Sequence, residues 1–449
     1  MPSTRRFVEG VLLLVLSSVR RDSTKLFGGP ISMGFDRLSK IATVFEDAYT
    51  LTNGEALSMA AMLSGVHPAI LGPSPPKTLS SWFLARLRRE NVFTACIDLE
   101  PMNPLASEFS IFAEPRPGTP PPGASGRGFS RAFSILRRGA SRSETVEDPR
   151  YGLDEALRTL TKLLYDAKRS GKPFLIVARL WDSHVPYRAP QGMARRLPSP
   201  KPMPRKRVGD LRKRVRGPWI EFLGSRWGWR SSVEDIAKTY SASIAMEGSI
   251  INDLLNELIS LGLENSVAMI VLSDHGESLG EHDVWFHHHG LYETNTRIPL
   301  ALYVPGLSPR RVRGRVSTID IAPTIARLLG IEIPRFAKRL SLLEAVEMGG
   351  VEDRTMLFVE YRAQRRVAVL VNDLKFVTPL GPDVVCRYCN TIHGGVEELY
   401  NVRRDPLEDY NIVDYSRDEA RELRRIADEL YREALKLRIS HSLSRSLEA

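Results

Sequence analysis

Residues 273–293, SDHGESLGEHDVWFHHHGLYE, crowd carboxylates and imidazoles into one stretch of the chain. An apolar run over 267–272 leads directly into Asp274 and His275. A buried strand with this ending presents a carboxylate and an imidazole at its carboxyl end, where open α/β sheets bind their ligands. The histidines at 287–289 add further metal-competent nitrogens. The spacing therefore predicts a metal or ligand site, and the alternative is a solvated polar loop after a strand.

A parallel sheet is needed to hold that site, and the rest of the chain predicts one. Short apolar runs, expected as buried strands, alternate with segments of helical spacing. The expected strands are 11–16, 92–97, 173–180, 267–272 and 298–304. The expected helices are 35–45, 56–63, 78–89, 153–170, 240–258 and 317–329. This alternation predicts an α/β fold with a doubly wound, mostly parallel sheet and helices on both faces.

Beyond about residue 350 the pattern changes to short strands that follow one another. They are expected at 356–360, 366–371 and 374–377, and a long terminal helix is expected at 417–437. We therefore predict an α/β domain over residues 1–345 and a smaller C-terminal α+β subdomain over residues 346–449.

Two segments of the first domain differ from their surroundings in composition. Residues 101–150 are rich in Pro, Gly, Ser and Arg, which predicts a flexible surface insertion without a core of its own. Residues 187–230, here called the basic segment, carry ten Lys and Arg side chains between 195 and 216, with Asp210 the only acid among them. The basic segment is interpreted either as a solvated insertion or as a positively charged docking surface for an anionic substrate or polymer. Nucleic acid ranks third, because no stacking pattern supports it.

The bulk composition is that of a large globular protein. A chain of 449 residues with 43% hydrophobic content can bury a sizeable core, and its net charge of +10 permits anionic partners. Glutamine is almost absent while Arg and Glu abound, a bias compatible with a thermophilic source. No stretch approaches the roughly 18 apolar residues that a membrane span needs.

The first residues allow two interpretations. Arg5 and Arg6 before the apolar run 10–16 are similar to a secretory signal, even a twin-arginine signal. Glu9 interrupts that pattern, and no small-residue cleavage site precedes the charges at 20–22. We therefore expect the run to be the first buried strand and the protein to be cytoplasmic.

The three cysteines, Cys96, Cys386 and Cys389, are too few for a disulfide framework. Cys386 and Cys389 form one C-x-x-C pair, with His393 four residues further on. This spacing is half of a zinc site, and the alternative is a pair of reduced thiols in a strand-loop segment.

The motif SDHGESLGEH with its following histidine and LYE resembles the sulfatase family of the alkaline-phosphatase superfamily. Other segments are similar to family motifs and occur in the family's order: LLVLSSVRRD at 13–22, FEDAYTLTNGEALSMAAMLSGVHP at 45–68, KPFLIVARLWDSHVPY at 172–187, RIPLALYVPG at 297–306 and ELYNVRRDPLEDYN at 398–411. The resemblance implies an alkaline-phosphatase-like α/β fold with a C-terminal α+β subdomain. It also implies a metal-dependent hydrolase that acts on a sulfuric or phosphoric ester, either an anionic small molecule or an anionic polymer.

The resemblance also assigns expected roles to single residues. It implies one divalent cation: calcium or magnesium if the site is rich in oxygen, and manganese or zinc if an Asp-His pair binds it. The metal ligands carried over are Asp274 and His275, together with the position of Ser17. The substrate-binding residues carried over are His184, His288 or His289, and Arg20.

Two positions depart from the family pattern. Ser17 stands where the family has an acidic metal ligand, and Glu55 stands where it has the Cys, Ser or Thr nucleophile. In one hypothesis Glu55 restores the lost charge, so that Glu55, Asp274 and His275 hold a cation that activates water. In the other the site is degenerate, and the protein is a pseudoenzyme that binds an anionic ligand or partner without turnover.

Overall fold

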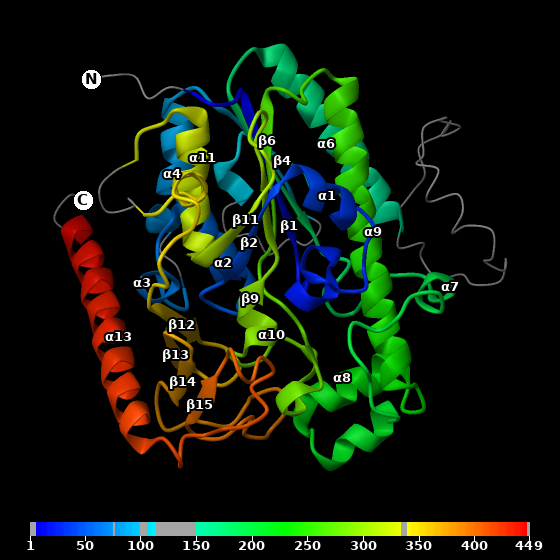
Figure 1. Cartoon of the computed structure of the whole chain (residues 1–449), viewed down its shortest axis with the longest axis vertical. Helices are drawn as coiled ribbons and strands as arrows, with labels where there is room; N and C mark the ends of the chain where they lie inside the picture. Colours follow the sequence, from blue (N-terminus) through cyan, green and yellow to red (C-terminus); the bar gives the residue numbers. More distant parts are fainter. Residues whose placement is uncertain (1–5, 75–76, 99–105, 114–149, 334–338, 447–449) are drawn as a thin grey trace.

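A computed structural model of the chain describes residues 6–74, 77–98, 106–113, 150–333 and 339–446 (Figure 1). Its main sheet has the strand order β11-β2-β10-β6-β1-β5-β3-β4, and β9 pairs with β2. The strands in chain order are β1 (Gly10–Leu16), β2 (Thr43–Tyr49), β3 (Phe93–Asp98), β4 (Ile111–Ala113), β5 (Phe174–Leu180), β6 (Val267–Ser273), β9 (Arg297–Ile298), β10 (Leu300–Tyr303) and β11 (Arg311–Ser317). The central strands β5, β1 and β6 are parallel, and β10 runs antiparallel between β6 and β2. The predicted α/β fold class is therefore confirmed.

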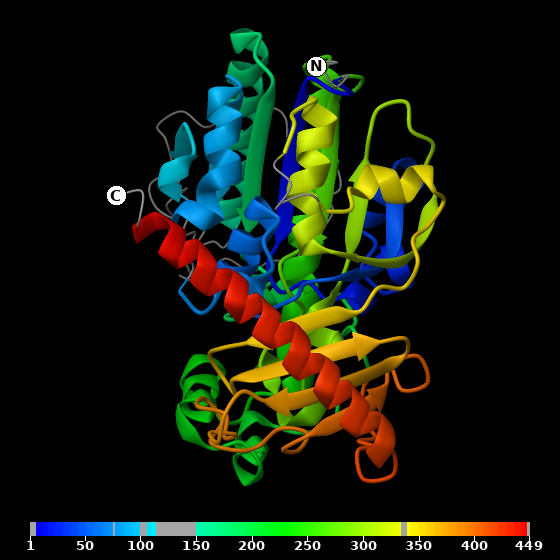
Figure 2. The same ribbon diagram turned by 90° about the vertical axis from the view of Figure 1, so that its left-hand side faces the viewer.

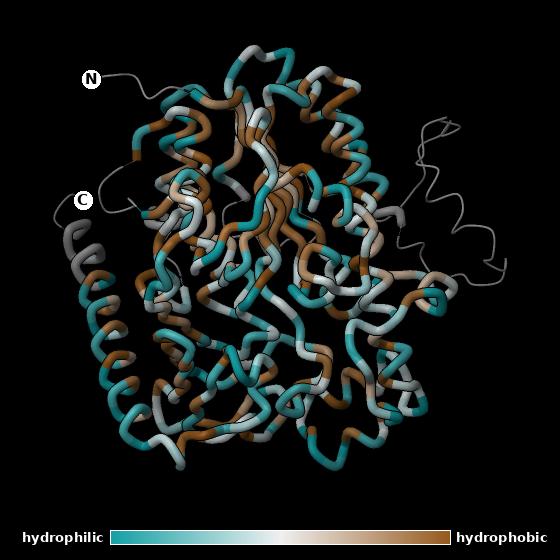
Figure 3. The backbone as a smooth tube through the Cα atoms, viewed as in Figure 1, coloured by the Kyte–Doolittle hydropathy of each residue, from teal (hydrophilic) through white to brown (hydrophobic). Residues whose placement is uncertain are grey.

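Helices cover both faces of this sheet because its central strands are apolar on both sides. Leu12 and Leu14 of β1 face one core, with α1 (Phe35–Ile41), α6 (Arg150–Ser170) and α9 (Val233–Ser260). The alternate residues Val11 and Leu13 face the other core, with α2 (Glu55–Ser64), α4 (Lys77–Arg89), α11 (Ile321–Leu329) and α12 (Leu342–Glu347). Figure 3 shows the hydrophobic strands running between these helical layers.

The C-terminal part forms a second, antiparallel sheet below the first. Its strands are β12 (Met356–Glu360), β13 (Arg366–Val371), β14 (Leu374–Pro379) and β15 (Glu398–Asn401), paired in that order. The long helix α13 (Arg417–Ser446) runs diagonally across this sheet (Figure 2). The predicted division at residues 345 and 346 falls inside α12.

Three expectations about the elements are corrected by the structure. Residues 35–45 are not one helix, because α1 ends at Ile41 and Phe45 lies in β2. The expected strand at 298–304 is divided at Pro299, which has no N–H to donate to a sheet. Within the predicted insertion 101–150, residues 111–113 form the edge strand β4, and most of the remainder lies outside the described residues.

The basic segment folds against the main domain. It contains α7 (Gln191–Ala194), a 3-10 helix at Val208–Lys213 and α8 (Gly217–Trp227). Its apolar side chains, Leu211, Trp219 and Leu223 among them, are buried in the main core. In the described part of the chain, no helix is both long and apolar enough to cross a membrane.

Candidate active site

The candidate site lies where the central strands of the main sheet end. Leu16 of β1 pairs with Leu180 of β5 and with Ser273 of β6, so the three strands end at one level. The loops that follow begin with Ser17, Trp181 and Asp274 at the same edge of the sheet. This register brings together residues from three distant parts of the sequence.

Helix α2 adds a carboxylate to that edge. Ser58 in its first turn donates a hydrogen bond to the backbone oxygen of Asp274 at 2.8 Å, which fixes the helix against the end of β6. Glu55, the first residue of α2, then faces two histidines: its Oε1 lies 3.3 Å from His184 Nε2 and 3.3 Å from His288 Nε2. With His275, these residues offer four ligand atoms that all lie within 4.8 Å of one another.

Hydrogen bonds to backbone oxygens orient two of these imidazoles. His184 Nδ1 lies 2.8 Å from the oxygen of Val185, and His275 Nδ1 lies 2.8 Å from the oxygen of Gly276. A ring that donates through Nδ1 keeps a lone pair on Nε2, the arrangement typical of metal-binding histidines. His275 Nε2 is buried without a hydrogen-bond partner in the described part of the chain.

Gly276 is required for this arrangement. A side-chain carbon at this position would lie 1.9 Å from the backbone oxygen of Thr294. The chain can therefore pass close behind the site only with glycine here.

The surroundings of the cluster lower the pKa values of Glu55, His275 and His288. Burial lowers the pKa of His275 to about 4. Burial also lowers the pKa of His288. Burial alone would raise the pKa of Glu55, but His288 and His184 outweigh it and hold that pKa well below its usual range. The ionised form of Glu55 and the neutral forms of His275 and His288 are the forms in which such groups bind metal ions.

Asp274 lies beside this cluster but is engaged by other groups. Its carboxylate accepts hydrogen bonds from Ser17 Oγ at 3.0 Å, from the N–H of Ser18 at 3.2 Å and from the N–H of His275 at 2.9 Å. Arg179 Nη2 lies 3.4 Å away, so a buried guanidinium neutralises the Asp274 charge. Of the predicted metal ligands, Glu55 and His275 lie in one cluster, and Asp274 Oδ1 lies 3.6 Å from His275 Nε2 at its edge. Ser17 is joined to the site only through its hydrogen bond to Asp274.

Arg179 is a site residue that sequence reasoning missed. Its signal was a single charged residue inside the apolar strand FLIVARL. A fully buried charge needs a partner, so the arginine implied a carboxylate beside β5.

The predicted substrate-binding residues are placed differently from one another. His184 and His288 face Glu55 in the cluster. Arg20 does not reach it, because its guanidinium binds Asp22 at 2.7 Å and Glu281 at 2.8 Å. His289 turns its Nδ1 towards two cysteine sulfurs instead of Glu55.

A cavity of about 160 Å³ opens in front of the cluster. Its lining includes Glu55, His184, His288 and Arg362. The side chain of Arg362 is 59% exposed, and its Nη1 lies 3.8 Å from Glu55 Oε2. Gly54 precedes α2 and has no side chain to cap it, and the first N–H groups of a helix attract anions. The cavity therefore combines a metal-competent floor with groups that suit an anionic ligand.

Comparison with known proteins finds sulfatases both among family models and among single relatives. A family model described as Sulfatase matches residues 10–331. The choline-sulfatase of Rhizobium meliloti is 29% identical over 187 residues, which cover 40% of this chain and 33% of that protein. The iduronate 2-sulfatase of Mus musculus is 26% identical over 348 residues, which cover 59% of this chain and 61% of that protein. The chain thus spans less than two thirds of the length of these relatives.

Solved structures share the fold over almost the entire chain. A protein in complex with its substrate D-glucosamine-2-N,6-O-disulfate superimposes with a TM-score of 0.67 and 16% identity, covering 96% of this chain and 99% of that chain. The phosphonate monoester hydrolase of Silicibacter pomeroyi gives a TM-score of 0.66 and 16% identity, covering 95% of each chain.

The mostly parallel sheet, with carboxylates and imidazoles at the ends of its central strands, is shared with the sulfatase and phosphonate monoester hydrolase structures. The chain belongs to the sulfatase family. The resemblance seen in its motifs is therefore confirmed at the level of family and fold.

Proposed function

We propose that the chain is a metal-dependent ester hydrolase in which Glu55 is a metal ligand instead of a nucleophile. The observation that carries the proposal is the convergence of Glu55, His184, His275 and His288, because three of them, Glu55, His184 and His288, line one cavity. The bond attacked would be a sulfuric or phosphoric ester. Sulfated sugars are the first substrate class to examine, because one structural neighbour binds a disulfated glucosamine as its substrate.

The donor set supports one kind of metal more than another. Three imidazole nitrogens and one carboxylate suit zinc or manganese, whereas calcium and magnesium prefer oxygen ligands. The ion pair between Asp274 and Arg179 also favours zinc or manganese over calcium or magnesium. The guanidinium already neutralises the carboxylate that a hard cation would need.

The residues of the chain have separate roles in this proposal. A bound divalent ion supplies Lewis acidity towards the ester oxygen and lowers the pKa of water. Glu55 contributes one negative charge among the imidazoles, and the backbone oxygens of Val185 and Gly276 hold the rings of His184 and His275 in place. Arg362, at the mouth of the cavity, neutralises the anionic group of the substrate.

Water is the nucleophile in this scheme, because the nearby hydroxyls are already engaged. Ser58 Oγ donates to the backbone oxygen of Asp274 and lies 3.1 Å from Thr50 Oγ1. Attack by Ser58 would break the contact that fixes α2 to the sheet.

A second candidate function is binding of an anionic ligand without turnover. It is favoured by the glutamate at the position that the family resemblance assigns to the nucleophile. In this case Arg362 and the first turn of α2 would bind the anion, and the histidine cluster would have only a structural role.

The decisive experiment measures turnover and metal content together. Metal-free protein would be reconstituted with zinc, manganese, calcium or magnesium and assayed with aryl sulfate, aryl phosphate and a sulfated glucosamine. We expect turnover with zinc or manganese, and a loss of at least 100-fold in kcat/KM in Glu55→Gln and His275→Ala, equivalent to about 3 kcal/mol. Both variants should also bind the metal more weakly.

Glu221→Gln is the matched control, because Glu221 is exposed and pairs only with Arg212 among the contacts described. It should retain full activity and metal content. Absence of turnover with every metal, together with saturable sulfate binding in calorimetry, would contradict the proposed hydrolase. It would support binding of an anionic ligand without turnover.

A further inference from the structure

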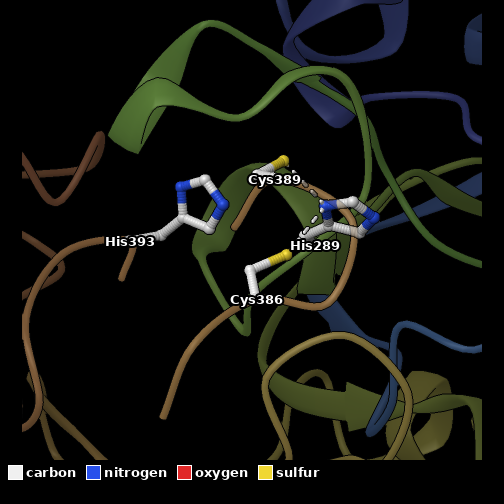
Figure 4. Close-up of side chains that lie close together, drawn as sticks. All are labelled: His289, Cys386, Cys389 and His393. Carbon is white, nitrogen blue, oxygen red and sulfur yellow. Dashed lines mark hydrogen bonds between the residues drawn. The ribbon is translucent and has the colours of Figure 1, made fainter. Parts of the chain in front are cut away.

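A second cluster of metal-competent side chains adjoins the cavity, whose lining includes one of its four members, His289 (Figure 4). It contains Cys386, Cys389 and His393 from the connection between β14 and β15, and His289 from the loop after β8 (Trp285–His287). The ligand atoms of these four residues all lie within 4.8 Å of one another. The cluster is buried, with each of the four side chains at most 2% exposed.

The distances in this cluster match a tetrahedral zinc site. His289 Nδ1 lies 3.6 Å from Cys386 Sγ and 3.7 Å from Cys389 Sγ. Zinc bonds of about 2.3 Å to sulfur and 2.0–2.1 Å to nitrogen place S and N about 3.6 Å apart at tetrahedral angles. The spacing between ring and sulfurs is therefore the edge of such a tetrahedron.

The fourth ligand, His393, is oriented by a hydrogen bond to a backbone oxygen. His393 Nδ1 lies 2.8 Å from the backbone oxygen of His282, and its Nε2 is buried without a hydrogen-bond partner in the described part of the chain. A backbone oxygen that fixes one ring nitrogen and leaves the other for the metal is typical of zinc-binding histidines.

The backbone between Cys386 and Asn390 forms a tight turn that brings the two sulfurs of the C-x-x-C pair together. The N–H of Asn390 donates to the oxygen of Cys386 at 2.9 Å, and Asn390 has a φ of 48°, which closes a tight turn around both sulfurs. Residues 380–397 contain no helix or strand. Hydrogen bonds from Arg366 to the oxygen of Gly395 and from the N–H of Arg387 to the oxygen of Ala363 hold this connection, and a bound metal ion would add to them.

Three parts of the molecule meet at this cluster. The N–H of Arg216 donates to the oxygen of Cys389 at 2.9 Å, and the N–H of Trp219 donates to the oxygen of Tyr388 at 3.0 Å, so α8 of the basic segment is docked on the turn. The ring of His289 stacks on Tyr388 at 4.7 Å. The cluster thus connects the main domain, the basic segment and the C-terminal subdomain.

We propose that His289, Cys386, Cys389 and His393 bind one structural zinc ion. Four protein ligands, two of them thiolates, complete the coordination of zinc, and Cys386, Cys389 and His393 do not line the cavity that Glu55, His184 and His288 line. Two thiolates balance the charge of the ion, so the buried site is neutral. The proposal does not depend on whether the Glu55 cluster is catalytic.

The test uses cobalt as a spectroscopic substitute for zinc in the full-length protein. Cobalt bound to thiolates gives a sulfur-to-metal charge-transfer band and intense visible bands when the site is tetrahedral. We expect the charge-transfer band in the wild type and in Glu55→Gln, and we expect it to be absent from Cys386→Ser/Cys389→Ser. Only the cysteine cluster can supply the thiolate band, so failure of the proposed hydrolase would leave this result unaffected.

Cys96→Ser is the matched control, because Cys96 is equally buried but lies in β3, away from the cluster. It should keep the cobalt spectrum. If the double cysteine variant does not fold, titration of the wild type with a mercurial thiol reagent replaces it, and zinc should be released in proportion to the thiols modified. A purified chain without zinc and without a thiolate–cobalt band, or one with a Cys386–Cys389 disulfide, would overturn the proposal.

Discussion

At the residue scale, Arg179 is the most informative side chain of the site, because it places a buried positive charge beside the carboxylates at the strand ends. Its guanidinium is fully buried between Asp274, at 3.4 Å, and Asp98, at 3.6 Å. It also lies over the ring of Trp181 at 4.4 Å. A protein side chain therefore supplies the positive charge that the strand-end carboxylates require.

Removal of that charge should destabilise the protein strongly. Arg179→Met would leave Asp274 and Asp98 beside each other without the guanidinium, and breaking a buried pair in this way costs about 3–5 kcal/mol. Urea unfolding followed by tryptophan fluorescence would measure the loss. Arg212→Met removes an exposed partner of Glu221 and should cost less than about 1 kcal/mol. Equal, small effects of both substitutions would show that the buried pair does not stabilise the fold.

The residues at strand ends could be predicted from the sequence, but their partners could not. Asp274 and His275 follow an apolar run, so their position at the edge of the sheet is set by local pattern. The approach of His289 to Cys386 joins residues 97 positions apart and depends on how the second sheet docks. That docking has no local signal, which is why the C-x-x-C pair predicted only half of a zinc site.

At the element scale, the short helix α3 (Pro68–Leu71) shows how one histidine joins two domains. His67 Nδ1 accepts a hydrogen bond from the N–H of Ala69 at 3.1 Å and so caps the helix. Its Nε2 lies 3.0 Å from the oxygen of Leu357 in β12. Because Nδ1 accepts, the ring is neutral and Nε2 is the donor.

Acidification should therefore weaken the fold through His67. Burial lowers the pKa of His67 from 6.5 to about 4. Between these values the unfolded chain binds a proton that the folded chain excludes, so the free energy of unfolding falls as the pH is lowered. From pH 7 to pH 5 the free energy of unfolding should fall by at most about 2 kcal/mol. The fall is smaller than this limit because the ring is partly exposed to solvent. Urea unfolding of the wild type and of His67→Asn at both pH values would measure it.

Asparagine retains an acceptor for the helix cap and does not titrate, so the difference between the two proteins isolates His67. The wild type should lose more stability than His67→Asn on going to pH 5. Parallel losses in the two proteins would contradict the prediction.

Elements with a strong local pattern were the predictable ones. The apolar runs at β1, β5 and β6 gave strands close to their observed bounds. β2 was missed because Phe35, Leu38, Ile41 and Phe45 keep helical spacing across the end of α1, and the sheet overrides that spacing. β4 was missed because its three residues lie in a Pro- and Gly-rich segment and pair only at the edge of the sheet.

At the scale of the whole molecule, the two sheets share one hydrophobic cluster. Tyr49 and Leu51 from the main domain pack in the same cluster as Phe358 and Val367 from the C-terminal sheet. The backbone joins them as well, since the N–H of Val359 donates to the oxygen of Leu51 at 3.0 Å. A common core of this kind couples the unfolding of both parts.

We therefore expect the chain to unfold in one cooperative transition. All six tryptophans lie between residues 82 and 285, so their fluorescence reports on the main domain, while amide exchange of the β13 peptide reports on the C-terminal sheet. The two transitions in urea should coincide, because the shared cluster cannot be lost from one sheet alone. Phe358→Ala should move both to lower urea by the same amount, at a cost of about 3–5 kcal/mol. Loss of β13 protection at a urea concentration where the fluorescence is still native would show two independent domains, and Phe358→Ala would then shift only the C-terminal transition.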